Sequence, residues 1–152
     1  MGVNNMLHSE LIALNKGVHT EKDLFKLIAQ DLKTKGFVNE GYLQGITERE
    51  DKFPTGLITP FLNVALPHSD TKYVEEPFIY VVRLVKPVTV HQMGDNQEME
   101  VKDLFFLGIK DPSKQVGLLS TLMQLFQDEE FVEQYKALQT ETEVYEVLKN
   151  KL

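Results

Sequence analysis

The residues best placed to do chemistry lie in the middle of the chain, where an apolar run ends at a proline and a histidine. Most residues from Phe61 to Leu66 are apolar, which is typical of a short strand buried on both faces. Pro67 has no backbone N–H to donate, so strand pairing is expected to end there. His68 therefore follows a strand end, where open α/β sheets tend to place functional groups. Its imidazole, with an ordinary pKa of about 6.5, can be neutral near pH 7 and accept a phosphoryl group as a nucleophile.

Two polar residues follow this histidine and are typical of a turn or of the start of a helix. Ser69 offers a hydroxyl and a backbone N–H that could donate to a phosphate. Asp70 would repel phosphate if it pointed inward, so we expect it to cap the following turn. A purely structural role for His68, as a partly buried and hydrogen-bonded side chain, remains an alternative on these residues alone.

An arginine precedes the histidine in the sequence. Arg49 lies near the end of a predicted helix and is followed by a glycine turn, Pro54-Thr55-Gly56. A guanidinium does not favour protonation of a nearby imidazole, but it can bind an anion that is transferred to it. The alternative is a solvated charge at the helix end, paired with Glu48 or Glu50.

These segments resemble the enzyme IIA domain of the fructose–mannitol class of the bacterial sugar phosphotransferase system. The resemblance extends from about Glu10 onward. After His68 the sequence is similar to the galactitol-type branch, because other branches usually have glycine where Ser69 stands. The matching runs are Arg49-Glu50, Pro54-Thr55-Gly56, Val64-Ala65-Leu66-Pro67-His68, Pro77 to Leu84, Pro87-Val88, Val101 to Ile109, Leu118-Leu119 and Phe126-Gln127-Asp128.

The resemblance implies roles for individual residues and for partners. His68 would attack phosphorus through Nε2, and Arg49 matches the active-site arginine of the family. The family often has a second histidine near the start of the helix that contains Leu118; here Gln115 stands at that position and could donate to a phosphoryl oxygen without titrating. An exposed helix residue is the alternative for Gln115. The implied donor is the histidine-containing phosphocarrier protein, the implied acceptor is a cysteine of a sugar-specific IIB component, and no cofactor or metal is expected.

Composition bounds the possible functions. The 152 residues are expected to form one IIA-like domain, residues 1–152, with ordinary hydrophobic and charged contents of 42% and 26%. A net charge of −7 argues against nucleic-acid binding, and the lack of cysteine excludes disulfides and thiolate chemistry. Four scattered histidines do not form a convincing metal-binding pattern. No apolar run is long enough for direct membrane insertion and no secretion signal is evident, so we predict a cytoplasmic protein.

Apolar runs and helical patterns alternate along the chain. We predict an α/β fold: a single-domain sandwich with a mixed sheet of about five strands, covered by helices on both faces. Predicted strands are Ser9 to Leu14, Phe61 to Leu66, Pro77 to Leu84, Val88 to Val90 and Val101 to Ile109. Predicted helices begin after Thr20, at Asn39, at Asp111-Pro112-Ser113, after Asp128, and at the capping box Thr140 to Glu143.

Three functions are compatible with this pattern. The leading hypothesis is a phosphoryl carrier that serves uptake of a galactitol-type polyol or a similar carbohydrate. A second is a regulatory module of the same fold, which controls another protein according to phosphorylation of His68. A third is a non-catalytic interaction domain in which His68 is structural.

Overall fold

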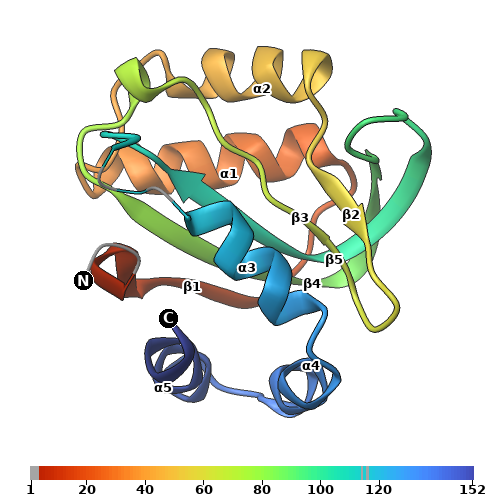
Figure 1. Ribbon diagram of the computed structural model, residues 1–152. Helices are drawn as coiled ribbons and strands as arrows, with labels where there is room; N and C mark the ends of the chain where they lie inside the picture. The colour runs from red at the N-terminus through yellow and green to blue at the C-terminus, as the bar shows by residue number, and fades with distance from the viewer. Residues whose placement is uncertain (1–3, 114, 116) are drawn as a thin grey trace.

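One mixed sheet of five strands forms the centre of the molecule (Figure 1). The computed structural model describes residues 4–113, 115 and 117–152. The strands are β1 (Leu7–Lys16), β2 (Gly56–Ile58), β3 (Asn63–Ala65), β4 (Phe78–His91) and β5 (Glu98–Gly108). Their order in the sheet is β1-β4-β5-β3-β2. The β1–β4 and β3–β5 pairs are parallel, and the other two pairs are antiparallel.

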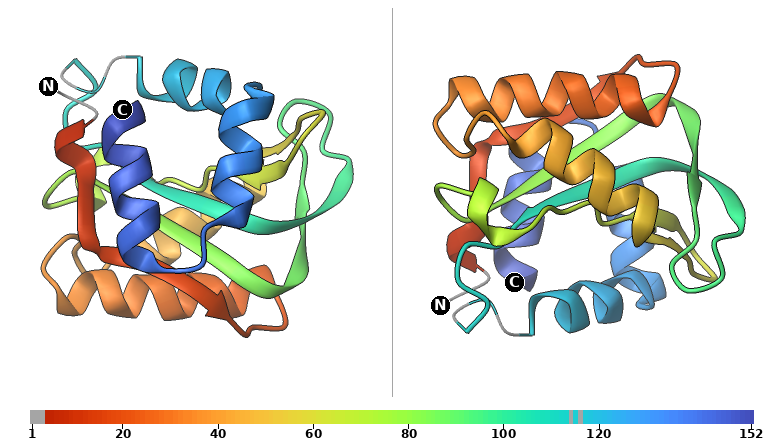
Figure 2. Two further views of the ribbon diagram at one scale, coloured as in Figure 1. Left: turned by 90° about the horizontal axis from the view of Figure 1, so that it is seen from below. Right: turned by 90° about the horizontal axis from the view of Figure 1, so that it is seen from above.

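Helices cover both faces of the sheet, as the two views in Figure 2 show. Helices α1 (Glu21–Thr34) and α2 (Tyr42–Lys52) lie over one face. Helices α3 (Leu118–Phe126), α4 (Glu129–Ala137) and α5 (Glu141–Lys151) lie on the other side. Two short 3-10 turns, η1 (Asn4–Met6) and η2 (Thr71–Tyr73), complete the elements. The predicted α/β sandwich is confirmed.

The sheet divides the apolar side chains into two cores. In β4, Phe78, Tyr80 and Val82 belong to the core beneath α1 and α2, whereas Ile79 and Val81 belong to the opposite one. Successive side chains of a strand point to opposite faces, so a strand covered on both faces must be apolar almost throughout. This explains the continuous apolar runs of β4 and β5. Among the described residues, no helix is long and apolar enough to cross a bilayer.

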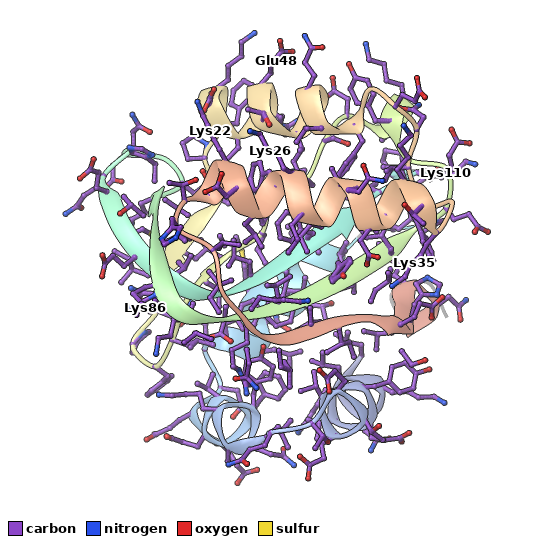
Figure 3. The ribbon with its side chains drawn as sticks, turned by 180° about the vertical axis from the view of Figure 1, so that it is seen from behind. Lys22, Lys26, Lys35, Glu48, Lys86 and Lys110 are labelled. Atoms are coloured by element: carbon purple, nitrogen blue, oxygen red, sulfur yellow. The ribbon has the colours of Figure 1, made fainter. Side chains whose placement is uncertain are left out.

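Local capping chemistry sets the starts of three helices as predicted. The Thr20 side chain accepts from the backbone N–H of Asp23, and the Asp128 side chain accepts from that of Phe131. Thr140 and Glu143 form the predicted reciprocal capping box. The outer surfaces of α1 and α2 are charged: Figure 3 shows Lys22, Lys26 and Glu48 pointing into solvent.

Several predicted boundaries differ from the structure. The strand predicted at Phe61 to Leu66 is the shorter β3, Asn63–Ala65, and the helix predicted to begin at Asn39 begins at Tyr42. The segment after Pro54 is not only a turn: Gly56–Ile58 forms strand β2, antiparallel to β3. A Cβ on Gly56 would lie 2.6 Å from the His91 carbonyl oxygen, so this glycine permits a close backbone approach. The two runs Pro77 to Leu84 and Val88 to Val90 join into the single strand β4, with a register shift between Arg83 and Val88.

The predicted helix start at Asp111 is wrong, because α3 begins at Leu118. Pro112, Ser113 and Gly117 lie in turns, and Lys114 and Val116 are outside the described residues. The Asp111 carboxylate accepts from both the backbone N–H and the hydroxyl of Ser113, which favours a local turn over a helix.

Helix α2 is held close to η2 by two glycines. A Cβ on Gly45 would lie 2.4 Å from the Tyr73 ring, and one on Gly41 would lie 2.7 Å from it. Asn39 also donates its backbone N–H to the Tyr73 carbonyl at 3.1 Å. The close packing fixes where the last turn of α2 lies relative to the segment from His68 to Tyr73.

We expect Gly45→Ala to destabilise the fold, although alanine is the better helix former. Helix propensity favours alanine by about 1 kcal/mol. The clash with Tyr73 is of the overpacking kind, which costs about 1–3 kcal/mol, so a net loss of about 1 kcal/mol in unfolding free energy is expected. Urea denaturation measures this loss. Gly17→Ala is the matched control, because nothing lies within 4 Å of the added Cβ. A Gly45→Ala protein more stable than wild type would contradict the packing role of this glycine.

Candidate active site

His68 lies just beyond β3, beside the end of β5. The backbone N–H of Leu107 in β5 donates to the Pro67 carbonyl at 2.9 Å, and His68 forms an isolated parallel bridge with Leu107. The sequence predicts that strand pairing ends at Pro67, but it continues to His68 through this one bridge. Proline has no backbone N–H to donate, yet its carbonyl can still accept a hydrogen bond from the neighbouring strand. The imidazole is held at a strand end by backbone contacts on the neighbouring strand.

The hydrogen bond at Nδ1 determines which ring nitrogen of His68 is free. Nδ1 lies 2.8 Å from the Leu66 carbonyl oxygen. A carbonyl can only accept, so Nδ1 must carry the proton in this contact. In the neutral ring the lone pair then lies on Nε2, which leaves this nitrogen able to act as a nucleophile.

The surroundings of His68 favour the neutral ring. Burial lowers the pKa of His68, and the positive charge of Arg49 lowers it further. The hydrogen bond to Leu66 and the negative charge of Asp70 act in the opposite direction. Because the net pKa is below the ordinary value of 6.5, the ring is uncharged near pH 7.

Arg49 extends from the last turn of α2 toward the segment after His68. Its Nη1 atom lies 3.3 Å from Oδ1 of Asp70, and the two side chains are 36% and 62% exposed. An exposed pair at this distance is weak and can exchange for another anion. Arg49 Nε is buried and has no hydrogen-bond partner among the described residues, so one donor of the guanidinium is unused. The predicted alternative, pairing with Glu48 or Glu50, is not what the structure shows, since these carboxylates bond Gln44 and Thr55.

The predicted capping role of Asp70 is wrong. Asp70 occupies the N-cap position of η2, but its side chain forms no capping hydrogen bond. The carboxylate contacts Arg49 instead. A sequence pattern identifies a capping position, but it does not reveal a cation supplied by a helix 21 residues earlier in the chain.

Ser69 and Gln115 are both buried, and each has part of its polar group in use. The Ser69 hydroxyl donates to the Asp70 carbonyl at 2.9 Å. Gln115 Oε1 accepts from the backbone N–H groups of Lys110 and Asp111, at 3.2 and 3.0 Å. Gln115 is therefore not an exposed helix residue, because it lies in the turn before α3. No hydrogen bond joins its Nε2 to another described residue.

Glu50 and Thr55 were not identified as site residues from the sequence. They are 5% and 2% exposed, and they connect α2 to the strand that leads to His68. The Glu50 carboxylate accepts from both the backbone N–H and the hydroxyl of Thr55. Their only signal in the sequence is membership of the runs Arg49-Glu50 and Pro54-Thr55-Gly56.

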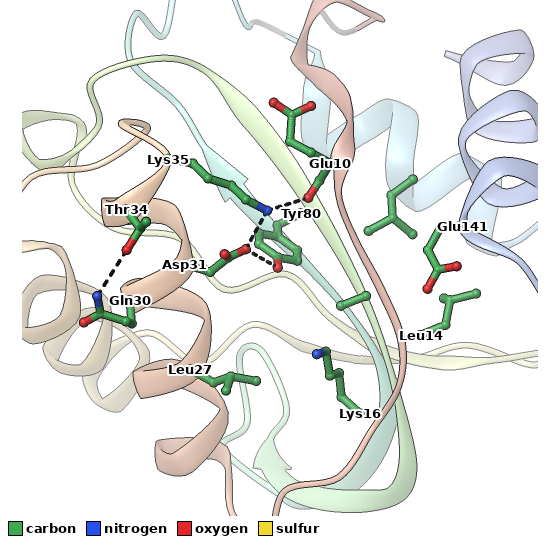
Figure 4. A pocket seen from close by; sticks show the side chains of 12 residues that line it. Glu10, Leu14, Lys16, Leu27, Gln30, Asp31, Thr34, Lys35, Tyr80 and Glu141 are labelled. Atoms are coloured by element: carbon green, nitrogen blue, oxygen red, sulfur yellow. Dashed lines mark hydrogen bonds and ion pairs between the residues drawn. The ribbon is translucent and has the colours of Figure 1, made fainter.

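A separate hollow between α1 and β1 is less suited to chemistry (Figure 4). It has a volume of about 540 Å³. The Asp31 carboxylate accepts from the Tyr80 hydroxyl at 2.6 Å and from the Lys35 ammonium at 3.0 Å, so these central groups satisfy one another. Burial and Asp31 raise the pKa of Tyr80, which keeps its hydroxyl protonated. Among the described residues no cluster of three or more histidine or acidic side chains could hold a metal ion.

The chain matches the family model of the phosphoenolpyruvate-dependent sugar phosphotransferase system, EIIA 2, over residues 5–151. The galactitol-specific EIIA component of the phosphotransferase system from Escherichia coli (strain K12) is 29% identical over 106 residues, which cover 70% of this chain and 71% of that protein.

Solved structures share the fold. The nitrogen regulatory protein IIA-Ntr from Neisseria meningitidis has a TM-score of 0.77 at 22% identity, covering 96% of this chain and 98% of that one. The complex of enzyme IIAMtl with phosphorylated enzyme IIBMtl from Escherichia coli has a TM-score of 0.74 at 18% identity, and the match covers 94% of this chain and 96% of that one. The chain thus belongs to the EIIA 2 family of the phosphoenolpyruvate-dependent sugar phosphotransferase system and resembles its galactitol-specific members.

Proposed function

We propose that this protein is a phosphoryl carrier in which His68 Nε2 accepts phosphate and passes it on. The observation that carries the proposal is the hydrogen bond from Nδ1–H to the Leu66 carbonyl, which leaves the lone pair on Nε2. The donor is the phosphohistidine form of the small histidine-containing phosphocarrier protein. The acceptor is a cysteine of a sugar-specific IIB component.

Both transfers balance without a cofactor. In the first, the lone pair of Nε2 forms a P–N bond while the P–N bond of the donor breaks, and the donor imidazole recovers its lone pair. In the second, a cysteine thiolate of the IIB component forms a P–S bond while the P–N bond at His68 breaks. Nδ1 keeps its proton throughout, held by Leu66. Catalysis then depends on positioning and charge, as is usual for phosphoryl transfer.

Arg49 supplies the charge that the incoming phosphoryl group needs. A phosphorylated ring carries close to two negative charges near neutral pH. The Arg49–Asp70 pair is exposed and loose, so Nη1 of the guanidinium can exchange the carboxylate for phosphoryl oxygens. Ser69 and Gln115 are supporting donors in this proposal, through the Ser69 hydroxyl and the Gln115 amide.

Similarity to named relatives favours transport over regulation. The relatives at 29% identity are galactitol-specific components, so we propose that the chain serves uptake of galactitol or a related carbohydrate. The likeness to the nitrogen regulatory protein, at 22% identity, concerns the fold alone. The complex of enzyme IIAMtl with phosphorylated enzyme IIBMtl, at 18% identity, likewise concerns the fold, so a IIB component as acceptor is proposed from membership of the phosphotransferase family. Location in the cytoplasm stays a prediction.

The first test is covalent labelling. The purified chain is expected to gain one acid-labile phosphoryl group when it is incubated with phosphoenolpyruvate, the phosphocarrier protein and its kinase. His68→Gln is expected to gain none and to keep its fold, because His68 lies in a loop beside the core. Intact-mass measurement and circular dichroism check both results. Undiminished labelling of the variant would remove His68 from the mechanism.

A second test separates Arg49 from Gln115. A hydrogen bond to a charged group contributes about 1.5–3 kcal/mol and a neutral one about 1 kcal/mol. Arg49→Ala should therefore slow transfer at least about ten-fold, and Arg49→Lys should recover part of the loss. Gln115→Ala should cost only about five-fold. Single-turnover rates of phosphoryl acceptance measure these effects, with thermal unfolding as a control because Gln115 also braces the Lys110–Asp111 loop. A greater loss in Gln115→Ala than in Arg49→Ala would contradict the proposed role of the arginine.

The lowered pKa of His68 predicts the pH dependence of acceptance. Only the neutral ring has a lone pair on Nε2, so the rate should stay level as the pH falls from about 8 to the ordinary pKa, and should drop only below 6.5. At a pH just below 6.5, His68 binds more protons in the unfolded chain than in the folded one. Its contribution to the free energy of unfolding therefore falls as the pH is lowered through this range. Removing the cation with Arg49→Gln should raise the pKa toward its ordinary value. Histidine NMR titration measures it, and a wild-type pKa above 6.5 would refute this expectation.

A further inference from the structure

Hydrogen bonds connect a buried carboxylate to the N–H of Leu66, and a further hydrogen bond connects the carbonyl of Leu66 to the ring of His68. Glu50 Oε2 accepts from Thr55 N–H at 2.9 Å, and Glu50 Oε1 accepts from the Thr55 hydroxyl at 2.9 Å. The backbone N–H of Leu66 donates to Thr55 Oγ1 at 3.2 Å and to the Thr55 carbonyl at 3.3 Å. The Leu66 carbonyl then accepts from His68 Nδ1 at 2.8 Å.

The direction of each of these hydrogen bonds follows from the groups that form it. An ionised Glu50 carboxylate can only accept, so the Thr55 hydroxyl donates its single proton to it. The hydroxyl oxygen is then oriented to receive Leu66 N–H. The chain therefore anchors the residue whose carbonyl selects the tautomer of His68.

The carboxylate also links the two proposed catalytic residues. Glu50 follows Arg49 near the end of α2. Its hydrogen bonds with Thr55 connect this end of the helix to the residue that precedes β2. On the other side of the Leu66–Pro67 segment, the backbone N–H of Leu107 in β5 donates to the Pro67 carbonyl. The Leu66–Pro67 segment is thus held between Thr55 and β5.

We propose that Glu50 is a positioning residue, which acts through Thr55 and Leu66 to set the orientation and tautomer of His68 and its distance from Arg49. The N–H and the carbonyl of Leu66 belong to different peptide units. The effect is accordingly mechanical: the anchored backbone fixes the acceptor for Nδ1–H. The consequence for transfer rate rests on the proposed phosphoryl-carrier function, whereas the consequence for the ring tautomer does not.

Burial, hydrogen bonds and nearby charges act on the pKa of Glu50 in opposite directions. Burial raises its pKa, and the hydrogen bonds from Thr55 lower it. Among the neighbouring charges, Asp51 raises the pKa of Glu50 and His91 lowers it. Burial, together with the charges of Glu50 and Asp51, raises the pKa of the neighbouring Glu21 to about 8, so Glu21 is protonated and uncharged near pH 7. The hydrogen bonds from Thr55 therefore stabilise the charged form of Glu50 against burial and against the negative charge of Asp51.

Thr55→Val tests the proposal because valine keeps the shape of threonine and removes the hydroxyl. Thr55→Ser keeps the hydroxyl and is the rescue variant. Thr59→Val is the matched control: the Thr59 hydroxyl lies in the same hairpin and donates to the Leu62 carbonyl at 2.6 Å, but it is not part of the chain to His68. Glu50→Gln retains the side-chain shape and removes one of the two acceptors.

The readout is long-range ¹H–¹⁵N NMR of the unphosphorylated, ¹⁵N-histidine-labelled protein, which reports the proton position on each ring. We expect Nδ1–H for His68 in wild type, Thr55→Ser and Thr59→Val. In Thr55→Val and Glu50→Gln we expect a shift toward the mixture of tautomers found for an exposed histidine. Phosphoryl acceptance should slow about five-fold in these two variants, the effect of losing one hydrogen bond.

The outcomes separate this proposal from the carrier function. An unchanged His68 tautomer in folded Thr55→Val and Glu50→Gln would overturn the positioning role, whatever the rates. A tautomer shift without any phosphoryl acceptance by wild type would support the positioning role and refute the carrier function. If Thr55→Val fails to fold, Glu50→Gln and Thr55→Ser decide: the former must lose and the latter must keep the Nδ1–H tautomer.

Discussion

The hydrogen bond between His68 Nδ1–H and the Leu66 carbonyl is the interaction on which the proposed phosphoryl transfer depends. It fixes the proton on one ring nitrogen and leaves the other as a nucleophile. It is effective only because the carbonyl itself is immobile. Thr55 holds the N–H of the same residue, and β5 holds the next carbonyl along the chain. The mixed sheet thus places a parallel neighbour, β5, beside a very short strand, β3, whose end presents the imidazole.

The charges around His68 are consistent with the proposed role, in which a phosphoryl group is bound and then released. A deeply buried ion pair at Arg49 would have to be broken at a high cost for each transfer. The Arg49–Asp70 pair is instead long and exposed, so exchange with a phosphoryl group is inexpensive. In the proposed transfer, the negative charge of Asp70, which acts on the pKa of His68, would also repel a bound phosphoryl group and so favour its release. Burial of the ring completes this balance by keeping the acceptor neutral.

Much of the fold could be predicted because it follows from local chemistry. The caps at Thr20, Asp128 and Thr140 depend on residues only three positions apart, and the apolar runs of β4 and β5 follow from burial on both faces. The start of α3 was missed because Asp111 and Gln115 hold a turn through side-chain bonds that propensity does not describe. His68 and Arg49 were identified from a strand end and a family resemblance. The Arg49–Asp70 ion pair joins residues 21 positions apart, and the hydrogen bonds from Glu50 to Leu66 depend on how α2 packs against the β2–β3 hairpin, so neither could be predicted from sequence patterns.

The position of phosphorus on the His68 ring is the most direct test of this account. After phosphorylation of the ¹⁵N-histidine-labelled protein, ¹⁵N and ³¹P NMR can identify the nitrogen that carries the phosphoryl group. We expect phosphorus on Nε2 and a proton retained on Nδ1, because Leu66 holds Nδ1–H before the transfer. Phosphorus on Nδ1, or on a residue other than His68, would contradict the assignment of the Leu66 hydrogen bond as the determinant of reactivity.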